Sequence, residues 1–217
     1  MYPHRVASIN IAKHAAVLVA SFLSLASIAS AAPITYNVAI DTSSISGTAG
    51  ALDFNFNPGP LVTQAASLQI LNFTSDGTLA GSPVLTGDVA GALPATVTFD
   101  NGTPFNDYFE GFTFASALSF DVSLFGPALS APDGTSTSGS TFAFSMFSDP
   151  AGTIPVLTSD KTNGFALTVS VNLDGSTTLT SFVSTGPSVP EPDSLALVAT
   201  GLTITLGALF LRARIRA

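Results

Sequence analysis

Carboxylates are the side chains best suited to chemistry in the central part of this 217-residue chain. Asp107 and Glu110 are the nearest approach to the pair of carboxyl groups that a glycosidase requires. Positions three apart in a regular strand point to opposite faces, so this spacing argues against a catalytic pair. Lys161 could serve a Ser-Lys nucleophile, but its place in a turn beside Asp160 favours an ordinary solvated surface charge.

A second motif concerns metal binding. The segment Asp53-x-Asn55-x-Asn57 is similar to the start of a calcium-binding EF-hand loop. It departs from that loop at position six, where Pro58 replaces glycine, and at position twelve, where Gln64 replaces glutamate. A strand with a polar outer face explains the spacing better than an EF-hand does.

Calcium binding elsewhere needs only carboxylate and carbonyl oxygens. Asp41 and Asp53 are therefore kept as candidate calcium ligands, and no other cofactor is predicted. Solvated aspartates in a turn and on a strand are the alternative interpretation of both residues.

The charge balance of residues 32–188 excludes several functions. Lys161 is the one basic side chain there, and no Cys, Trp, Arg or His occurs. Twelve acids oppose it, a formal charge of −11: Asp41, Asp53, Asp76, Asp88, Asp100, Asp107, Glu110, Asp121, Asp133, Asp149, Asp160 and Asp174. One lysine cannot neutralise nucleic-acid phosphates, and neither a Ser-His-Asp site nor a His/Cys zinc site can be built.

The elements that must position these groups are strands, because the apolar residues alternate with polar ones. The alternation is clearest at Ile34–Ile40, Leu52–Phe56, Leu118–Leu124 and Phe165–Leu173. Further strands are expected at Ala66–Phe73, Ala95–Phe99, Tyr108–Phe114, Thr141–Phe147, Thr153–Thr158 and Thr177–Val183.

Turn signals separate these strands, the clearest being Asp174-Gly175 after Phe165–Leu173. About ten short strands predict an all-β domain, an antiparallel β-sandwich over residues 32–183. A jelly-roll-like topology is favoured over an immunoglobulin-like one, because the Cys and Trp landmarks are missing. The many phenylalanines suit a core without tryptophan.

The first 31 residues are typical of a secretory signal peptide. Arg5 and Lys13 precede an apolar stretch from Ala15 to Ile28, and the small residues Ala29 and Ala31 mark a cleavage site before Ala32. Signal peptidase is therefore an expected partner. A second transmembrane anchor is the alternative, but the run is short and lacks a stop-transfer flank.

The last residues, 189–217, combine three features after a short linker at 184–188. Val189, Pro190, Glu191 and Pro192 are followed by the apolar run Leu195–Leu211. Arg212, Arg214 and Arg216 then form a basic stop. Seventeen residues at about 1.5 Å each make roughly 26 Å of helix, close to the minimum for a bilayer core. The arginines predict a cytoplasmic end for this helix and an exported body.

These residues, in this order, resemble the PEP-CTERM sorting signal of envelope-bearing bacteria. The resemblance implies recognition by an exosortase, a membrane-embedded transpeptidase-like protease that acts at or near Pro190-Glu191-Pro192. The two prolines hold Glu191 in an extended conformation outside any helix, which suits a protease. The precursor would then be a single-pass membrane protein whose anchor is temporary.

The segments Asp41–Ser43 and Leu52–Gly59 are similar to the opening of a recurrent group of PEP-CTERM proteins to which no activity can be attached. Such systems typically accompany exopolysaccharide production. The expectation is a non-enzymatic envelope or extracellular-matrix (biofilm) protein, structural or associated with exopolysaccharide. The alternative is a secreted carboxylate-dependent enzyme that acts on polysaccharide, and turnover of a matrix glycan discriminates between the two.

Overall fold

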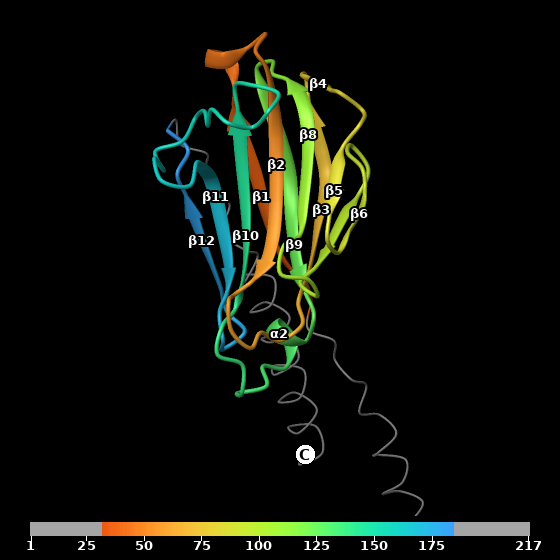
Figure 1. Cartoon of the computed structure of the whole chain (residues 1–217), viewed down its shortest axis with the longest axis vertical. Coiled ribbons are helices and arrows are strands. Elements are labelled where there is room, and N and C mark those ends of the chain that lie inside the picture. Colours follow the sequence, from red (N-terminus) through yellow and green to blue (C-terminus); the bar gives the residue numbers. More distant parts are fainter. Residues whose placement is uncertain (1–31, 185–217) are drawn as a thin grey trace, which may run out of the picture. The chain divides into compact units, whose positions relative to one another are not determined.

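The computed structural model describes residues 32–184, and these residues form an all-β domain of antiparallel sheets (Figure 1). The described residues hold twelve strands and two short helical turns, η1 (Ser43–Ile45) and α2 (Pro127–Ser130). The predicted all-β class is confirmed. Residues 1–31 and 185–217, which carry the predicted signal peptide and sorting signal, lie outside the described part.

Five strands form the first sheet. In spatial order they are β1 (Ile34–Asp41), β9 (Ala117–Phe125), β3 (Ser67–Ser75), β7 (Val97–Asp100) and β6 (Val89–Gly91). All four pairings are antiparallel, and the longest register joins β1 to β9.

The second sheet is wider. In spatial order its strands are β12 (Thr177–Ser181), β11 (Phe165–Val171), β10 (Ser140–Phe147), β2 (Ala49–Pro58), β8 (Asp107–Thr113) and β4 (Thr78–Leu79). A seventh strand, β5 (Val84–Thr86), also pairs with β8. β2 lies at the centre and pairs with β10 on one side and β8 on the other.

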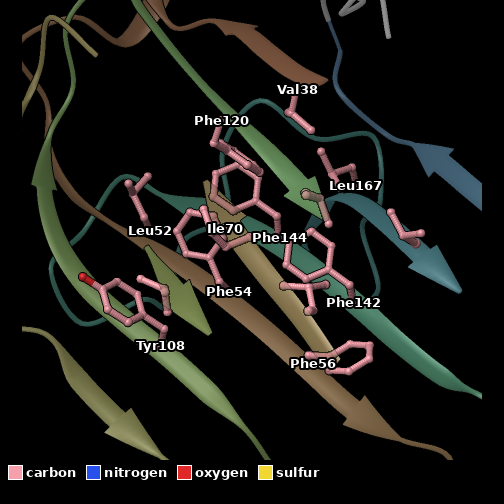
Figure 2. Close-up of a cluster of buried hydrophobic side chains, with 14 of the residues drawn as sticks. Val38, Leu52, Phe54, Phe56, Ile70, Tyr108, Phe120, Phe142, Phe144 and Leu167 are labelled. Atoms are coloured by element: carbon pink, nitrogen blue, oxygen red, sulfur yellow. The ribbon is translucent and has the colours of Figure 1, made fainter. Parts of the chain in front are cut away.

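The two sheets face each other across a core rich in phenylalanine. Phe54 of β2 packs edge-on against Phe120 of the other sheet, with ring centroids 5.2 Å apart, and Phe144 of β10 packs against Phe120 at 5.0 Å. Figure 2 shows these rings clustered with Phe142 and Tyr108. Aromatic pairs of this kind add to the free energy gained from burial. The fold is thus β-sandwich-like, and phenylalanine fills the space as predicted.

Two expectations were wrong. Thr153–Thr158 is not a strand: only single bridges link Pro155 to Phe147 and Thr158 to Val183. Ile154 is 56% exposed, Pro155 has no N–H to donate, and Leu157 has a φ of 55°, so a regular ladder cannot form. Leu173 was expected on a buried face, but β11 ends at Val171 and Leu173 is 52% exposed.

The predicted hairpin turn at Asp174-Gly175 is confirmed, since it joins β11 to β12. Gly175 has a φ of 82°, which a residue with a side chain adopts only at a cost. The Asp174 carboxylate accepts the backbone N–H of Ser176 at 2.9 Å, so the turn satisfies its own polar groups.

Candidate functional site

The outer face of β2 carries the polar motif that the sequence singled out. Leu52, Phe54 and Phe56 are buried in the core, so the alternate positions Asp53, Asn55 and Asn57 point away from it. The motif therefore belongs to a strand with a polar outer face, as predicted, and not to an EF-hand loop.

Strand pairing places a second carboxylate beside this face. Asp107 of β8 lies directly opposite Asn55, and Phe109 lies opposite Asp53. Directly paired residues share a face of the sheet, so Asp107 joins Asp53 and Asn55. On the other side, β10 presents Ala143 opposite Asn55, and this small side chain leaves room above the strand.

The three side chains are neighbours on this face. Asn55 Nδ2 donates a hydrogen bond of 2.5 Å to Asp53 Oδ1. The pKa of Asp53 is raised to about 8, first by burial and then by the hydrogen bonding and charge of Asp107, while the hydrogen bond from Asn55 acts in the opposite direction. Burial also raises the pKa of Asp107, whereas the hydrogen bond from Asp53 lowers it. Both carboxyl groups are therefore harder to ionise than a solvated aspartate.

Two oxygens of this group have no hydrogen-bond partner. Asn55 Oδ1 and Asp107 Oδ1 are both buried and unpaired. Buried polar atoms of this kind are rare in folded proteins and cost free energy when they stay unsatisfied. Lys161 does not reach them, because its Nζ donates to the carbonyl oxygen of Thr158 in a different loop.

A groove of about 370 Å³ opens over Asp53 and Asn55. Its wall includes Asn57, Thr141 and two aromatic rings, Phe105 and Phe165. Phe105 is 52% exposed, which is unusual for so large an apolar side chain, while Phe165 is half-buried. The groove thus combines acceptors and donors with an exposed aromatic ring.

Asp107 and Glu110 do not form a catalytic pair. Asp107 lies on the outer face of β8, whereas Glu110 is 1% exposed and points inward. This confirms the expectation that positions three apart in a regular strand face opposite ways. Glu110 instead accepts a hydrogen bond from the hydroxyl of Tyr108 and one of 2.8 Å from the backbone N–H of Gly81.

The two candidate calcium ligands lie in different sheets. Asp41 ends β1 in the five-stranded sheet, where its carboxylate accepts the backbone N–H of Ser43 at 2.9 Å. That hydrogen bonding, first from the Ser43 side chain and then from its backbone, lowers the pKa of Asp41. Asp53 lies on the outer face of the other sheet, so the structure does not bring the two together.

Asp41 has a different acidic neighbour. Asp41 and Asp76 line a second groove, of about 610 Å³, beside the end of β1. Both carboxylates accept hydrogen bonds from nearby serines, Ser43 and Ser116 respectively. Over residues 32–184, no group of three or more His, Cys, Asp or Glu side chains is placed to hold a metal ion.

The processing residues fall outside the described part of the chain. They are Ala29, Ala31, Val189, Pro190, Glu191, Pro192, Arg212, Arg214 and Arg216. Within residues 32–184, no helix has the length and apolar character needed to cross a membrane.

The contact between Asp53 and Asp107 is the feature that sequence reasoning missed. Each residue was considered alone, Asp53 for calcium and Asp107 with Glu110. The polar alternation of both strands was visible, but the register that sets Asn55 opposite Asp107 is a tertiary property.

Comparison with known proteins adds no assignment: no family model, no curated protein and no solved structure matches this chain. Its function is therefore argued from its own residues.

Proposed function

We propose that this is an exported protein of the cell envelope or extracellular matrix, non-enzymatic, with a structural or glycan-associated role. The observation that carries the proposal is the order of features in residues 189–217: Pro190-Glu191-Pro192, the apolar run Leu195–Leu211, and the arginines that follow. This order resembles a PEP-CTERM sorting signal, with an exosortase as the processing partner.

The extent of the folded domain supports this proposal. The first strand begins at Ile34 and the last ends at Ser181, followed by a single bridge at Val183. Cleavage before Ala32 and near Pro190 would therefore remove none of the described strands. Signal peptidase and an exosortase could both act without unfolding the sheets, and the membrane would be a transient partner of the precursor.

Replacing Glu191 with Ala tests the sorting proposal in the native host. The variant is expected to accumulate as an uncleaved form in the membrane fraction, because Glu191 is the residue that the protease is proposed to recognise. Asp193→Ala is the matched control, since it removes a nearby acid outside the tripeptide. Mass spectrometry of the mature wild-type protein should give a last residue close to Pro190. Finding the Leu195–Leu211 peptide on most mature molecules would contradict the proposal.

For the β domain, we propose that the groove over Asp53 and Asn55 is the surface that contacts exopolysaccharide. Sugar rings offer hydroxyls for Asn57 and Thr141 and a C–H face for the exposed ring of Phe105. The charge of −11 over residues 32–188 favours neutral or cationic glycans over strongly anionic ones.

Affinity electrophoresis through gels that contain the host's matrix polysaccharide tests this surface. Phe105→Ala should lose the retardation shown by the wild type. Leu173→Ala is the matched control, because Leu173 is exposed to the same extent, 52%, but does not line the groove. Equal retardation of both variants would rule out the groove as the glycan site.

The alternative is a carboxylate-dependent enzyme that acts on polysaccharide, and the Asp53–Asp107 pair is the observation in its favour. Glycosidases hold their two carboxyl groups about 5–9.5 Å apart to admit a sugar and a water. Here Asp53 and Asp107 are diagonal neighbours on adjacent strands, and hydrogen bonding between them is among the causes of their shifted pKa values, which indicates a closer approach than such a pair has. Turnover of matrix glycan by the protein, lost in Asp107→Asn, would nevertheless establish the enzyme.

We also infer a jelly-roll-like topology. β1, β3, β7 and β9 lie in one sheet, whereas β2, β4, β8 and β10 lie in the other, so the chain crosses repeatedly between the sheets. β9 is inserted between β1 and β3, and β8 is inserted between β2 and β4. Two nested Greek keys produce this interleaving, and β10 to β12 extend the second sheet. Long-range NMR contacts between β8 and β2, and between β9 and both β1 and β3, test the assignment.

A further inference from the structure

We propose that Asp53, Asn55 and Asp107 bind one calcium ion on the outer face of the seven-stranded sheet, beside the groove that Asp53 and Asn55 line. The proposal does not depend on the sorting signal or on glycan binding, because it rests on the side chains of two paired strands, β2 and β8. The sequence suggested Asp41 and Asp53 as calcium ligands. The site proposed now keeps Asp53 but exchanges Asp41 for Asn55 and Asp107, which the fold places beside Asp53.

The first argument is charge. Asp53 and Asp107 are diagonal neighbours on one face of the paired strands β2 and β8, and two carboxylates held close together repel each other unless a positive species lies between them. Lys161, the one basic residue of the described part, is bonded to Thr158 instead. The protein therefore supplies two acidic groups to this point and no cation of its own.

The second argument is independent of acidity. Asn55 Oδ1 is an amide oxygen, buried and without a partner, and it cannot be protonated at ordinary pH. A proton shared by Asp53 and Asp107 would satisfy Asp107 Oδ1 but would leave Asn55 Oδ1 unsatisfied. A cation satisfies both oxygens at once, so the unpaired amide oxygen favours an ion over a proton.

The third argument is the choice of ion. Two carboxylates and an amide carbonyl form an all-oxygen set, which suits calcium and does not suit zinc. Calcium takes six to eight oxygens, and the open groove of about 370 Å³ admits the waters that complete the shell. Sites of this kind in exported proteins bind at about 10⁻⁴ to 10⁻³ M.

Isothermal titration of the full chain in a mild detergent, first depleted of metal with chelator, tests the site. Calcium chloride should bind in a 1:1 ratio with a Kd of about 10⁻⁴ to 10⁻³ M. Asp107→Asn should weaken binding by roughly tenfold or more, because it removes one ligand charge. Calcium should also raise the Tm of the wild type above that in chelator at matched ionic strength, since the ion binds only the folded state.

Asp121→Asn is the matched control. Asp121 lies on β9 in the other sheet, and it accepts hydrogen bonds from Asn37 at 2.8 Å and from Asn72 at 2.7 Å. The Asp121→Asn variant thus removes the same charge as Asp107→Asn, but from an aspartate that already has asparagine partners. The calcium affinity of this variant should equal that of the wild type. An equal loss in Asp107→Asn and Asp121→Asn would show general charge screening and would overturn the site.

Asn55→Ala is a second variant that tests the same site if Asp107→Asn does not fold. This variant leaves the net charge unchanged and removes the unpaired amide oxygen together with the Nδ2 group that donates to Asp53, so weaker calcium binding in it supports the proposal. A shared proton in place of an ion predicts a different pattern: no heat of calcium binding, and a Tm that calcium leaves unchanged. That pattern would refute the calcium site.

Discussion

At the scale of single residues, this domain stabilises its carboxylates with neutral donors. Asp133, Asp149 and Asp160 each accept backbone N–H groups of their own turns. These hydrogen bonds lower the pKa of Asp133 and Asp160, led in each by a backbone N–H, and lower that of Asp149 against the opposing effect of burial. The domain can therefore carry twelve acids with a single lysine.

Asp76 gives a prediction for pH dependence. Its carboxylate accepts the Ser116 hydroxyl and the N–H of Ala117 at 3.0 Å, and these bonds, the Ser116 hydroxyl first, lower its pKa. Because the pKa is lowered by folding, the contribution to stability is present above about pH 4, the ordinary value, and is lost as pH falls through the folded pKa.

Asp76→Asn should therefore be less stable than the wild type at neutral pH, and the difference should shrink as the solution is acidified to about pH 2. Urea denaturation at a series of pH values measures this. Ser116→Ala, which removes the main donor, should behave in the same direction. A difference between Asp76→Asn and the wild type that stays constant with pH would contradict the assignment.

At the scale of elements, β8 connects the core to the loops before it. Its inward face carries Tyr108 and Glu110, both fully buried. The Tyr108 hydroxyl accepts the N–H of Leu93 at 3.0 Å and donates to Glu110, which also accepts the N–H of Gly81 at 2.8 Å. Two loops between β4 and β7 are thus tied to one strand by a short buried chain of hydrogen bonds.

Glu110→Ala should destabilise the domain by about 1–3 kcal/mol for each donor left without an acceptor, namely the Tyr108 hydroxyl and the Gly81 amide. Tyr108→Phe removes the hydroxyl that donates to Glu110, so it breaks the same hydrogen bond from the donor side. The double variant should cost less than the sum of the single ones, because both act on one chain of hydrogen bonds. Unfolding by guanidinium, followed by circular dichroism, measures all three. Strict additivity would show that the two side chains do not act together.

At the scale of the whole domain, one phenylalanine-rich core joins both sheets, while the surface is strongly acidic. Core residues come from nearly every long strand, so neither sheet could hold its buried face alone. The acidic surface works against compactness, since like charges repel each other across the domain. Both properties follow from the same composition, which has many apolar residues and few cations.

Salt should therefore stabilise this protein. The Tm should rise as sodium chloride is increased from about 0.01 M to about 1 M, because the screening length falls from about 30 Å to about 3 Å. Differential scanning fluorimetry in calcium-free buffer with chelator measures the effect apart from any bound ion. A Tm that falls over this range would show that attractive pairs, and not repulsion, dominate the surface.

The sequence alone determined the secondary structure and the class of fold. Alternation such as Leu52, Phe54 and Phe56 against Asp53 and Asn55 is a local property, because neighbouring residues in a strand must face opposite ways. It predicted most of the long strands and the hairpin at Asp174-Gly175. It failed at Thr153–Thr158, where an apolar run contains proline and a positive φ, and it did not reveal the short strands β4 to β6.

Only the tertiary structure decided which residues form the candidate site. Asp53 and Asp107 meet because β2 and β8, which are remote in sequence, pair in one particular register. A shift of that register by one residue would turn Asp107 to the opposite face, and no local pattern specifies it. Register is set by how both buried faces pack across the core, so the carboxyl pair and its unpaired amide oxygen exist only in the folded domain.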